Sequence, residues 1–89
     1  MSVEEEVVEL LKAGGLTIAT AESCTGGMVS ARLVGVPGVS EVFMEGLVTY
    51  SNEAKVRLLG VREETLETFG SVSRETAVQM AEGGCRRAG

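Results

Sequence analysis

The chain twice shows a strand-like segment that runs into a short polar turn and then into a helix-like segment. The first strand-like segment covers residues 16–21 and is followed by small polar residues and a glycine pair. The second covers residues 42–50, which read VFMEGLVTY, and it leads into a helical pattern over residues 52–59. Strands that alternate with helices predict a layered α/β/α fold, in which helices flank a sheet.

Helical patterns fill most of the remaining chain. Ser2 and Glu5 form a capping-box pattern that predicts a first helix, ended by a glycine pair. Further helices are expected from about Thr25, over residues 61–69 and over residues 73–88, which makes the order α-β-α-β-α-α-α. Two strands form only a marginal sheet. We therefore expect this sheet to be completed by a second copy of the chain or by missing residues of a larger domain.

Charge and hydropathy exclude several classes of partner. The net charge is −5 over 89 residues, which argues against nucleic acid or an anionic membrane. No apolar run approaches the roughly 20 residues of a membrane helix, and the N-terminal segment MSVEEEVVELL is acidic where a signal peptide is basic. We expect a cytoplasmic protein in which Cys24 and Cys85 are free thiols.

The absence of two residue types limits the chemistry. The chain contains no histidine and no aspartate, which excludes Ser-His-Asp and Cys-His catalysis within this chain. Two cysteines without histidine cannot close a zinc site. A base for proton transfer must come from a glutamate, one of the two lysines, Tyr50 or a bound water.

The turn after the first strand, within TIATAESCTGG, has the features of a ligand site. The first N–H groups of a helix lack partners inside the helix and can bind a phosphate or an oxyanion, and the glycines allow close approach. The turn matches neither a Walker A motif nor G-x-S-x-G. Ordinary helix capping explains these residue types equally well. Glu22 is either a surface charge or a buried carboxylate that orients a neighbour, and we expect Cys24 to be a small buried filler.

The turn after the second strand supplies a possible base. Lys55 lies in the first turn of the expected helix, where the helix dipole does not favour a positive charge. An exposed lysine at this position would be unremarkable. If the sheet brings the two strand ends together, Lys55 reaches the turn that holds Ser23. Activation of a serine by a lysine is a known route to a nucleophile and needs no histidine.

Three segments together carry a resemblance to a known family. They read TIATAESCTGG, VPGVSEVFMEGLVTYSNEAKVRLLGV and ETLETFGSVSRETAVQMAEG. The chain resembles the CinA family, and more narrowly its carboxy-terminal domain and the stand-alone nicotinamide-nucleotide amidases. The resemblance implies hydrolysis of nicotinamide mononucleotide to nicotinic acid mononucleotide and ammonia, in pyridine-nucleotide salvage. It implies a small pyridine nucleotide as partner, no metal and no cofactor.

The resemblance also implies roles for individual residues. Ser23 would be the nucleophile, Lys55 its general base, and Tyr50 would align that pair or the substrate. The backbone of the Thr25–Gly26–Gly27 segment would hold the oxyanion or the nucleotide phosphate. Thr25 as the nucleophile is an open alternative.

Further positions receive smaller roles. Glu22 and Asn52 fit the family motif as orienting residues. Arg57 could contact the phosphate, although a solvated position is expected for it.

The chain departs from the family in its length. Residues 1–89 correspond to the amino-terminal half of the domain, and the glycine-rich T-G-I-A-G-P segment that lines the same pocket in the family is absent. We therefore expect an incomplete sheet and an incomplete substrate site. Three functions follow as hypotheses: an amidase or its amino-terminal half, a non-catalytic nucleotide- or phosphate-binding module, and a structural remnant that self-associates as a homo-oligomer.

Overall fold

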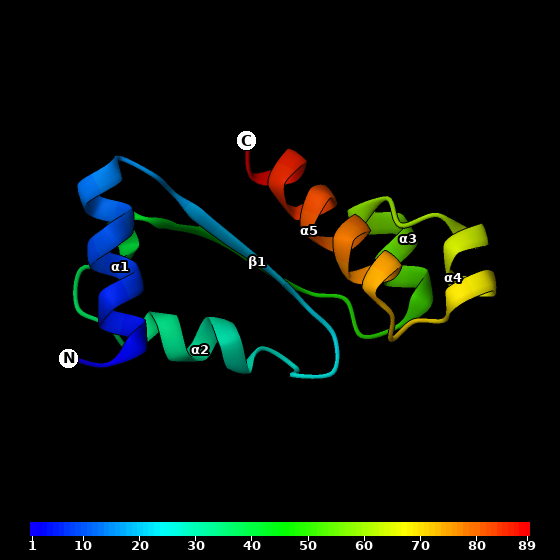
Figure 1. The fold of residues 1–89 in the computed structure, drawn as a ribbon, viewed down its shortest axis with the longest axis horizontal. Coiled ribbons are helices and arrows are strands. Elements are labelled where there is room, and N and C mark those ends of the chain that lie inside the picture. The colour runs from blue at the N-terminus through cyan, green and yellow to red at the C-terminus, as the bar shows by residue number, and fades with distance from the viewer.

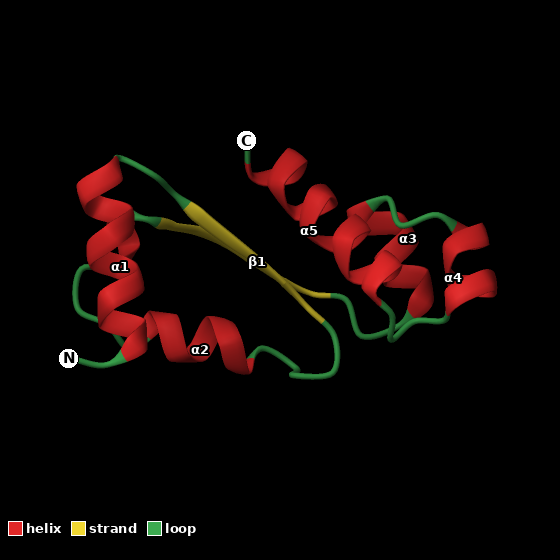
Figure 2. Ribbon diagram, in the orientation of Figure 1, coloured by secondary structure: helices red, strands yellow, loops and turns green.

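The computed structural model describes residues 1–89 and confirms the predicted order of helices and strands, with one short 3₁₀ helix added (Figures 1 and 2). No helix is both long enough and apolar enough to cross a membrane. The elements are α1 (Val3–Gly14), β1 (Ile18–Glu22), α2 (Met28–Val34), η1 (Val39–Glu41), β2 (Phe43–Val48), α3 (Asn52–Leu59), α4 (Glu63–Phe69) and α5 (Arg74–Ala88).

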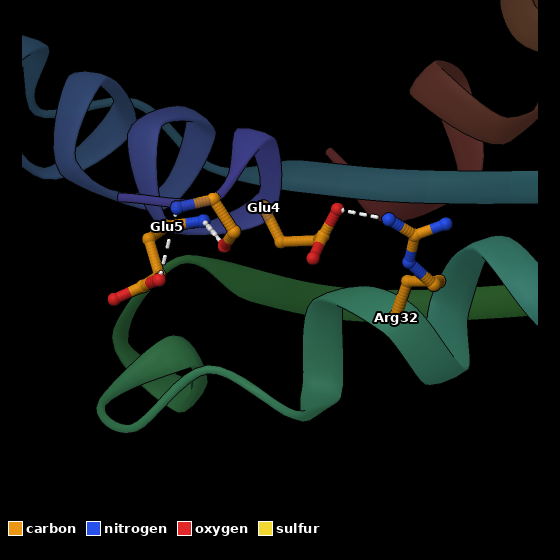
Figure 3. A network of polar contacts seen from close by, with 4 residues as sticks. Glu4, Glu5 and Arg32 are labelled. Atoms are coloured by element: carbon orange, nitrogen blue, oxygen red, sulfur yellow. Dashed lines mark hydrogen bonds and ion pairs between the residues drawn. The ribbon is translucent and has the colours of Figure 1, made fainter.

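Helix α1 begins at the predicted capping box. The Ser2 hydroxyl accepts the Glu5 N–H at 3.2 Å, and the Glu5 carboxylate accepts the Ser2 N–H at 3.0 Å. These two bonds satisfy N–H groups that the helix itself leaves free. Figure 3 shows both bonds beside the ion pair between Glu4 and Arg32, which ties α1 to α2.

The end of α1 corrects the predicted start of the first strand. Gly15 adopts a left-handed conformation with φ 65°, and the Leu16 N–H donates to the Leu11 carbonyl at 2.9 Å. This pattern is a helix C-terminal motif, in which the residue after the glycine still binds the helix. Leu16 therefore belongs to the capping motif that follows α1, and β1 starts two residues later, at Ile18.

The sheet has two parallel strands. Ile18 pairs with Phe43 and Ala19 with Glu45, so Met44 is an extra residue on β2, and from there the register is regular. Because the strands are parallel, both end at the same edge of the sheet. The two polar turns follow these carboxyl ends. The sheet contains no third strand, so each strand pairs with the other alone.

Helices cover both faces of the sheet, which confirms the layered α/β/α arrangement. On one face the Thr20 hydroxyl lies 2.7 Å from the Ser30 hydroxyl of α2. On the other face Ala21 packs against α5, where a Cβ built on Gly84 would lie 3.6 Å from its methyl group. The alternation of side chains along β1 thus places α2 and α5 on opposite sides.

Two separate hydrophobic clusters form the core. The first joins α1, α2 and the segment around η1, and its buried members are Val8, Leu33, Val39 and Val42. The second joins β2, α3 and α5, and its buried members are Leu47, Leu59, Val61 and Met80. Helix α5 approaches α3 so closely that a Cβ on Gly83 would lie 1.9 Å from the Leu59 carbonyl oxygen. Only glycine fits at that contact.

Candidate active site

The parallel sheet brings the two polar turns together at its carboxyl edge. Ser23 directly follows β1. After β2, Ser51 caps α3 by accepting the Ala54 N–H at 3.0 Å. This cap directs the first turn of α3 toward the end of β1, and the Lys55 Nζ donates to the Ser23 Oγ at 3.0 Å. The hydroxyl and the amine are therefore in direct contact.

The environment of Lys55 is unusual for a lysine. Its side chain is 1% exposed, and it forms no ion pair. Its two hydrogen-bond partners are the Ser23 hydroxyl and the Tyr50 carbonyl, the latter at 3.2 Å. Lysine is almost never fully buried without a counter-ion, and such placements concentrate at functional sites.

Tyr50 meets the pair through its backbone. Its carbonyl accepts from Lys55 and lies 3.5 Å from the Ser23 hydroxyl, whereas its side chain is 73% exposed. The Asn52 side chain is exposed and forms no hydrogen bond within the chain, and Arg57 is exposed as expected. Tyr50 thus contacts the pair through its carbonyl, and the aligning role expected of Tyr50 and the orienting role expected of Asn52 stay predictions.

Glu22 is a buried carboxylate that organises the first turn. It is 5% exposed. It accepts hydrogen bonds from the Thr25 hydroxyl (2.7 Å), from the N–H groups of Gly27 (3.2 Å), Val29 (2.9 Å) and Ser30 (3.0 Å), and from the Ser30 hydroxyl (2.7 Å). Of the two readings that the sequence left open for Glu22, the structure supports the buried, orienting one.

The hydrogen bonds to Glu22 decide its charge. Burial by itself would raise the pKa of this carboxyl, but hydrogen bonds from Ser30, Thr25 and the Val29 N–H outweigh burial and lower the pKa to about 2. Glu22 is therefore ionised at neutral pH and is a poor proton acceptor. Its negative charge also sits at the positive end of α2, where it is favourable.

The Glu22 carboxylate also explains why α2 begins at Met28, later than predicted. Residues 23–27 form a turn around the carboxylate, in which Gly26 and Gly27 adopt left-handed conformations with φ 60° and 104°. Such φ values are readily adopted by glycine alone. The glycine pair is needed for this turn conformation.

The turn leaves fewer free N–H groups than the sequence predicts. The Gly26 N–H donates to the Ser23 carbonyl at 3.0 Å, and the Gly27 N–H donates to Glu22. The N–H groups of Cys24 and Thr25 have no acceptor within the chain. Among the three residues Thr25–Gly27, whose backbone was expected to bind the oxyanion or the phosphate, only Thr25 has a free N–H. The Cys24 N–H is free as well. Sequence reasoning missed the free N–H of Cys24, although the position of Cys24 directly after Ser23 was a usable signal.

The expectation that Cys24 is buried is wrong, because Cys24 and Cys85 are both exposed, and both are free thiols as predicted. Cys24 lies in the turn beyond the end of β1. Both cysteines line a cavity of about 540 Å³ between β1 and α5, and Ser23 lies on its wall.

Comparisons with known proteins agree with this architecture. The family model described as "CinA C-terminal domain" matches residues 1–89. A "CinA-like protein" of Kosmotoga olearia is 62% identical over 88 residues, which are 99% of this chain and 21% of that protein. A "putative competence-damage inducible protein" of Clostridium acetobutylicum is 60% identical over 88 residues, again 99% of this chain and 21% of that protein.

Solved structures show the same fold. The crystal structure of competence/damage inducible protein CihA from Agrobacterium tumefaciens has a TM-score of 0.93 and 47% identity, over 96% of this chain and 52% of that chain. A CinA superfamily protein from Escherichia coli has a TM-score of 0.94 and 34% identity, over 96% of this chain and 49% of that chain. This chain therefore spans about half the length of these solved proteins and about a fifth of the curated relatives.

Proposed function

This chain belongs to the CinA C-terminal domain family, and from that membership and the geometry of the site we propose that it carries the nucleophile and the base of an amidohydrolase. The reaction is the conversion of nicotinamide mononucleotide to nicotinic acid mononucleotide and ammonia. One observation carries the proposal: the Lys55 amine lies 3.0 Å from the Ser23 hydroxyl in a chain without histidine or aspartate.

In the first half of the reaction, Ser23 forms an ester with the substrate. The Lys55 amine accepts the hydroxyl proton while the Ser23 Oγ attacks the amide carbon, and the carbonyl oxygen becomes an oxyanion. The free N–H groups of Cys24 and Thr25, next to the nucleophile, are suited to bind that oxyanion. Lys55 then transfers the proton to the departing nitrogen, and ammonia leaves.

In the second half, water breaks the ester. Lys55 accepts a proton from water as the water oxygen attacks the acyl carbon, and it returns that proton to the Ser23 oxygen when the acid departs. The Tyr50 carbonyl accepts a hydrogen bond from the Lys55 amine at 3.2 Å, which helps to hold the amine beside Ser23.

Thr25 is the weaker candidate for the nucleophile. Its hydroxyl donates to Glu22 at 2.7 Å, and Glu22 is ionised with a pKa of about 2. A carboxylate with so low a pKa is too weak a base to remove the proton of the Thr25 hydroxyl. Lys55 forms no hydrogen bond to Thr25.

Wild type and three variants test the proposal by ammonia release from nicotinamide mononucleotide. Wild type should release ammonia, whereas Ser23→Ala and Lys55→Ala should lose activity by about a thousandfold or more. Thr25→Val removes the other hydroxyl and should retain activity to within about tenfold, since its N–H group remains. Full activity in Ser23→Ala would contradict the mechanism. Loss in Thr25→Val with activity in Ser23→Ala would move the nucleophile to Thr25.

Self-association is a second candidate, favoured by the unpaired edge of β1 beside an apolar cavity. An open strand edge can pair with an added strand from another chain. Sedimentation velocity over a range of concentrations distinguishes the candidates. A concentration-dependent dimer that neither binds nor hydrolyses the nucleotide supports self-association, and turnover by a monomer argues against it.

A further inference from the structure

The connection between α4 and α5 lies on the same cavity as the nucleophile. Ser71, Val72 and Ser73 line this cavity together with Ser23 and Cys24. The Val72 side chain is 80% exposed, so the chain presents an apolar side chain to the cavity without packing it against the protein. We propose that Val72 is a specificity-determining residue that contacts the aromatic ring of the carboxamide substrate, an inference that rests on the proposed amidase function.

The backbone around Val72 is held in place on both sides. The Gly70 carbonyl accepts the Thr76 hydroxyl at 2.8 Å and the Ser73 hydroxyl at 3.0 Å. The Ser73 hydroxyl also accepts the Thr76 N–H at 3.2 Å and caps α5, and Thr76 is fully buried. Val72 therefore occupies the middle of a braced turn, and its exposure follows from the way this turn is fixed.

The chemistry of the cavity matches a flat aromatic ring. No charged side chain lines it, and most of its lining residues are apolar, among them Ala21 and Met80. Such walls recognise a ligand by apolar contact, with a few polar groups fixing its orientation. Ser23 and the free N–H groups of its turn supply the polar contacts to the carboxamide. Val72 supplies an apolar surface from the α4–α5 connection, whereas Ser23 comes from the end of β1.

Contact between the ring and Val72 removes water from apolar surface on both partners, which is favourable. The Val72 side chain has no hydrogen-bonding group and takes no part in the contact between Ser23 and Lys55, so we expect its replacement to leave that contact in place. The inference therefore predicts an effect on substrate binding and little effect on the chemical step. A merely structural role for Val72 would not separate these two effects, because a disturbed fold would impair both binding and the chemical step.

The test combines binding and turnover of nicotinamide mononucleotide for wild type, Val72→Ala and Val72→Asp. Titration calorimetry on the Ser23→Ala background measures binding without turnover. We expect Val72→Ala to raise Kd and KM roughly threefold to tenfold and Val72→Asp to raise them more than about tenfold, with kcat unchanged within about twofold. Val78→Asp is the matched control, because Val78 is an exposed valine of α5 that does not line the cavity.

The possible outcomes separate this inference from the proposed function. Unchanged Kd and KM in Val72→Asp, or an equal change in Val78→Asp, overturn the inference while turnover by wild type upholds the function. Weaker binding in Val72→Asp with no ammonia release by wild type supports the ring contact and refutes the amidase. Absence of both binding and turnover in wild type overturns both.

Discussion

Replacing Glu22 by glutamine should destabilise the protein, and the loss should depend on pH. The carboxylate accepts five hydrogen bonds from the turn and from the start of α2. Glutamine has the same shape, but it carries no charge and turns one acceptor oxygen into a donor that faces other donors. The folded protein therefore loses both the charge and part of the hydrogen bonding.

The pKa of Glu22 sets the size of the effect. A folded-state pKa of about 2 against an ordinary value of 4.5 corresponds to roughly 2–3 kcal/mol at neutral pH, after allowance for solvent screening near the turn. Because the folded pKa is depressed, this stabilisation is fully present above about pH 4.5 and disappears as the pH falls toward about 2.

Urea unfolding followed by circular dichroism measures the effect, since the chain has no tryptophan and a single tyrosine. The difference in unfolding free energy between wild type and Glu22→Gln should shrink by roughly 2–3 kcal/mol between pH 7 and pH 2. Glu67→Gln, an exposed glutamate without hydrogen bonds, controls for general charge effects. If the difference in unfolding free energy between wild type and Glu22→Gln stays constant across this pH range, the low pKa assigned to Glu22 is refuted.

Two further predictions concern other parts of the fold. Lys55→Met should raise the unfolding free energy by about 1 kcal/mol or more, because it replaces a buried amine that has no counter-ion by an apolar chain of similar length. The same variant should abolish ammonia release, and a destabilised Lys55→Met would contradict this reasoning. Gly83→Ala should destabilise by about 3 kcal/mol or more in urea unfolding, because its methyl group would overlap the Leu59 carbonyl. Gly84→Ala, with an ordinary contact of 3.6 Å, should be neutral or stabilising by up to about 1 kcal/mol, and equal losses in the two variants would contradict the close contact.

Features set by neighbouring residues could be predicted from the sequence. The Ser2–Glu5 capping box and the Ser51 cap of α3 depend on a spacing of three residues, and the structure shows both. The α/β/α layering follows from the alternation of strand and helix patterns. The contact between Ser23 and Lys55 was predictable only on the condition that the two strands lie side by side in the same direction, which the sequence does not state.

Other features depend on the backbone, which residue types describe poorly. Tyr50 contacts Lys55 through its carbonyl, and the free N–H of Cys24 is a backbone group as well. Leu16 was predicted to begin the first strand, yet its N–H donates to the Leu11 carbonyl in the motif that ends α1. The four residues that donate five hydrogen bonds to Glu22 are close in sequence, but only the left-handed glycines fold them around one carboxylate.

The division of the core into two clusters has a consequence for how the site is maintained. Lys55 belongs to α3, whose Leu59 lies in the second cluster, whereas the turn around Glu22 is anchored on α2, whose Leu33 lies in the first. Fraying of the α3–α5 unit alone is enough to withdraw the amine from its serine, with α1 and α2 still folded. Amide hydrogen exchange would register such an opening as a subglobal event, and the lifetime of the assembled pair would then be shorter than the lifetime of the native fold.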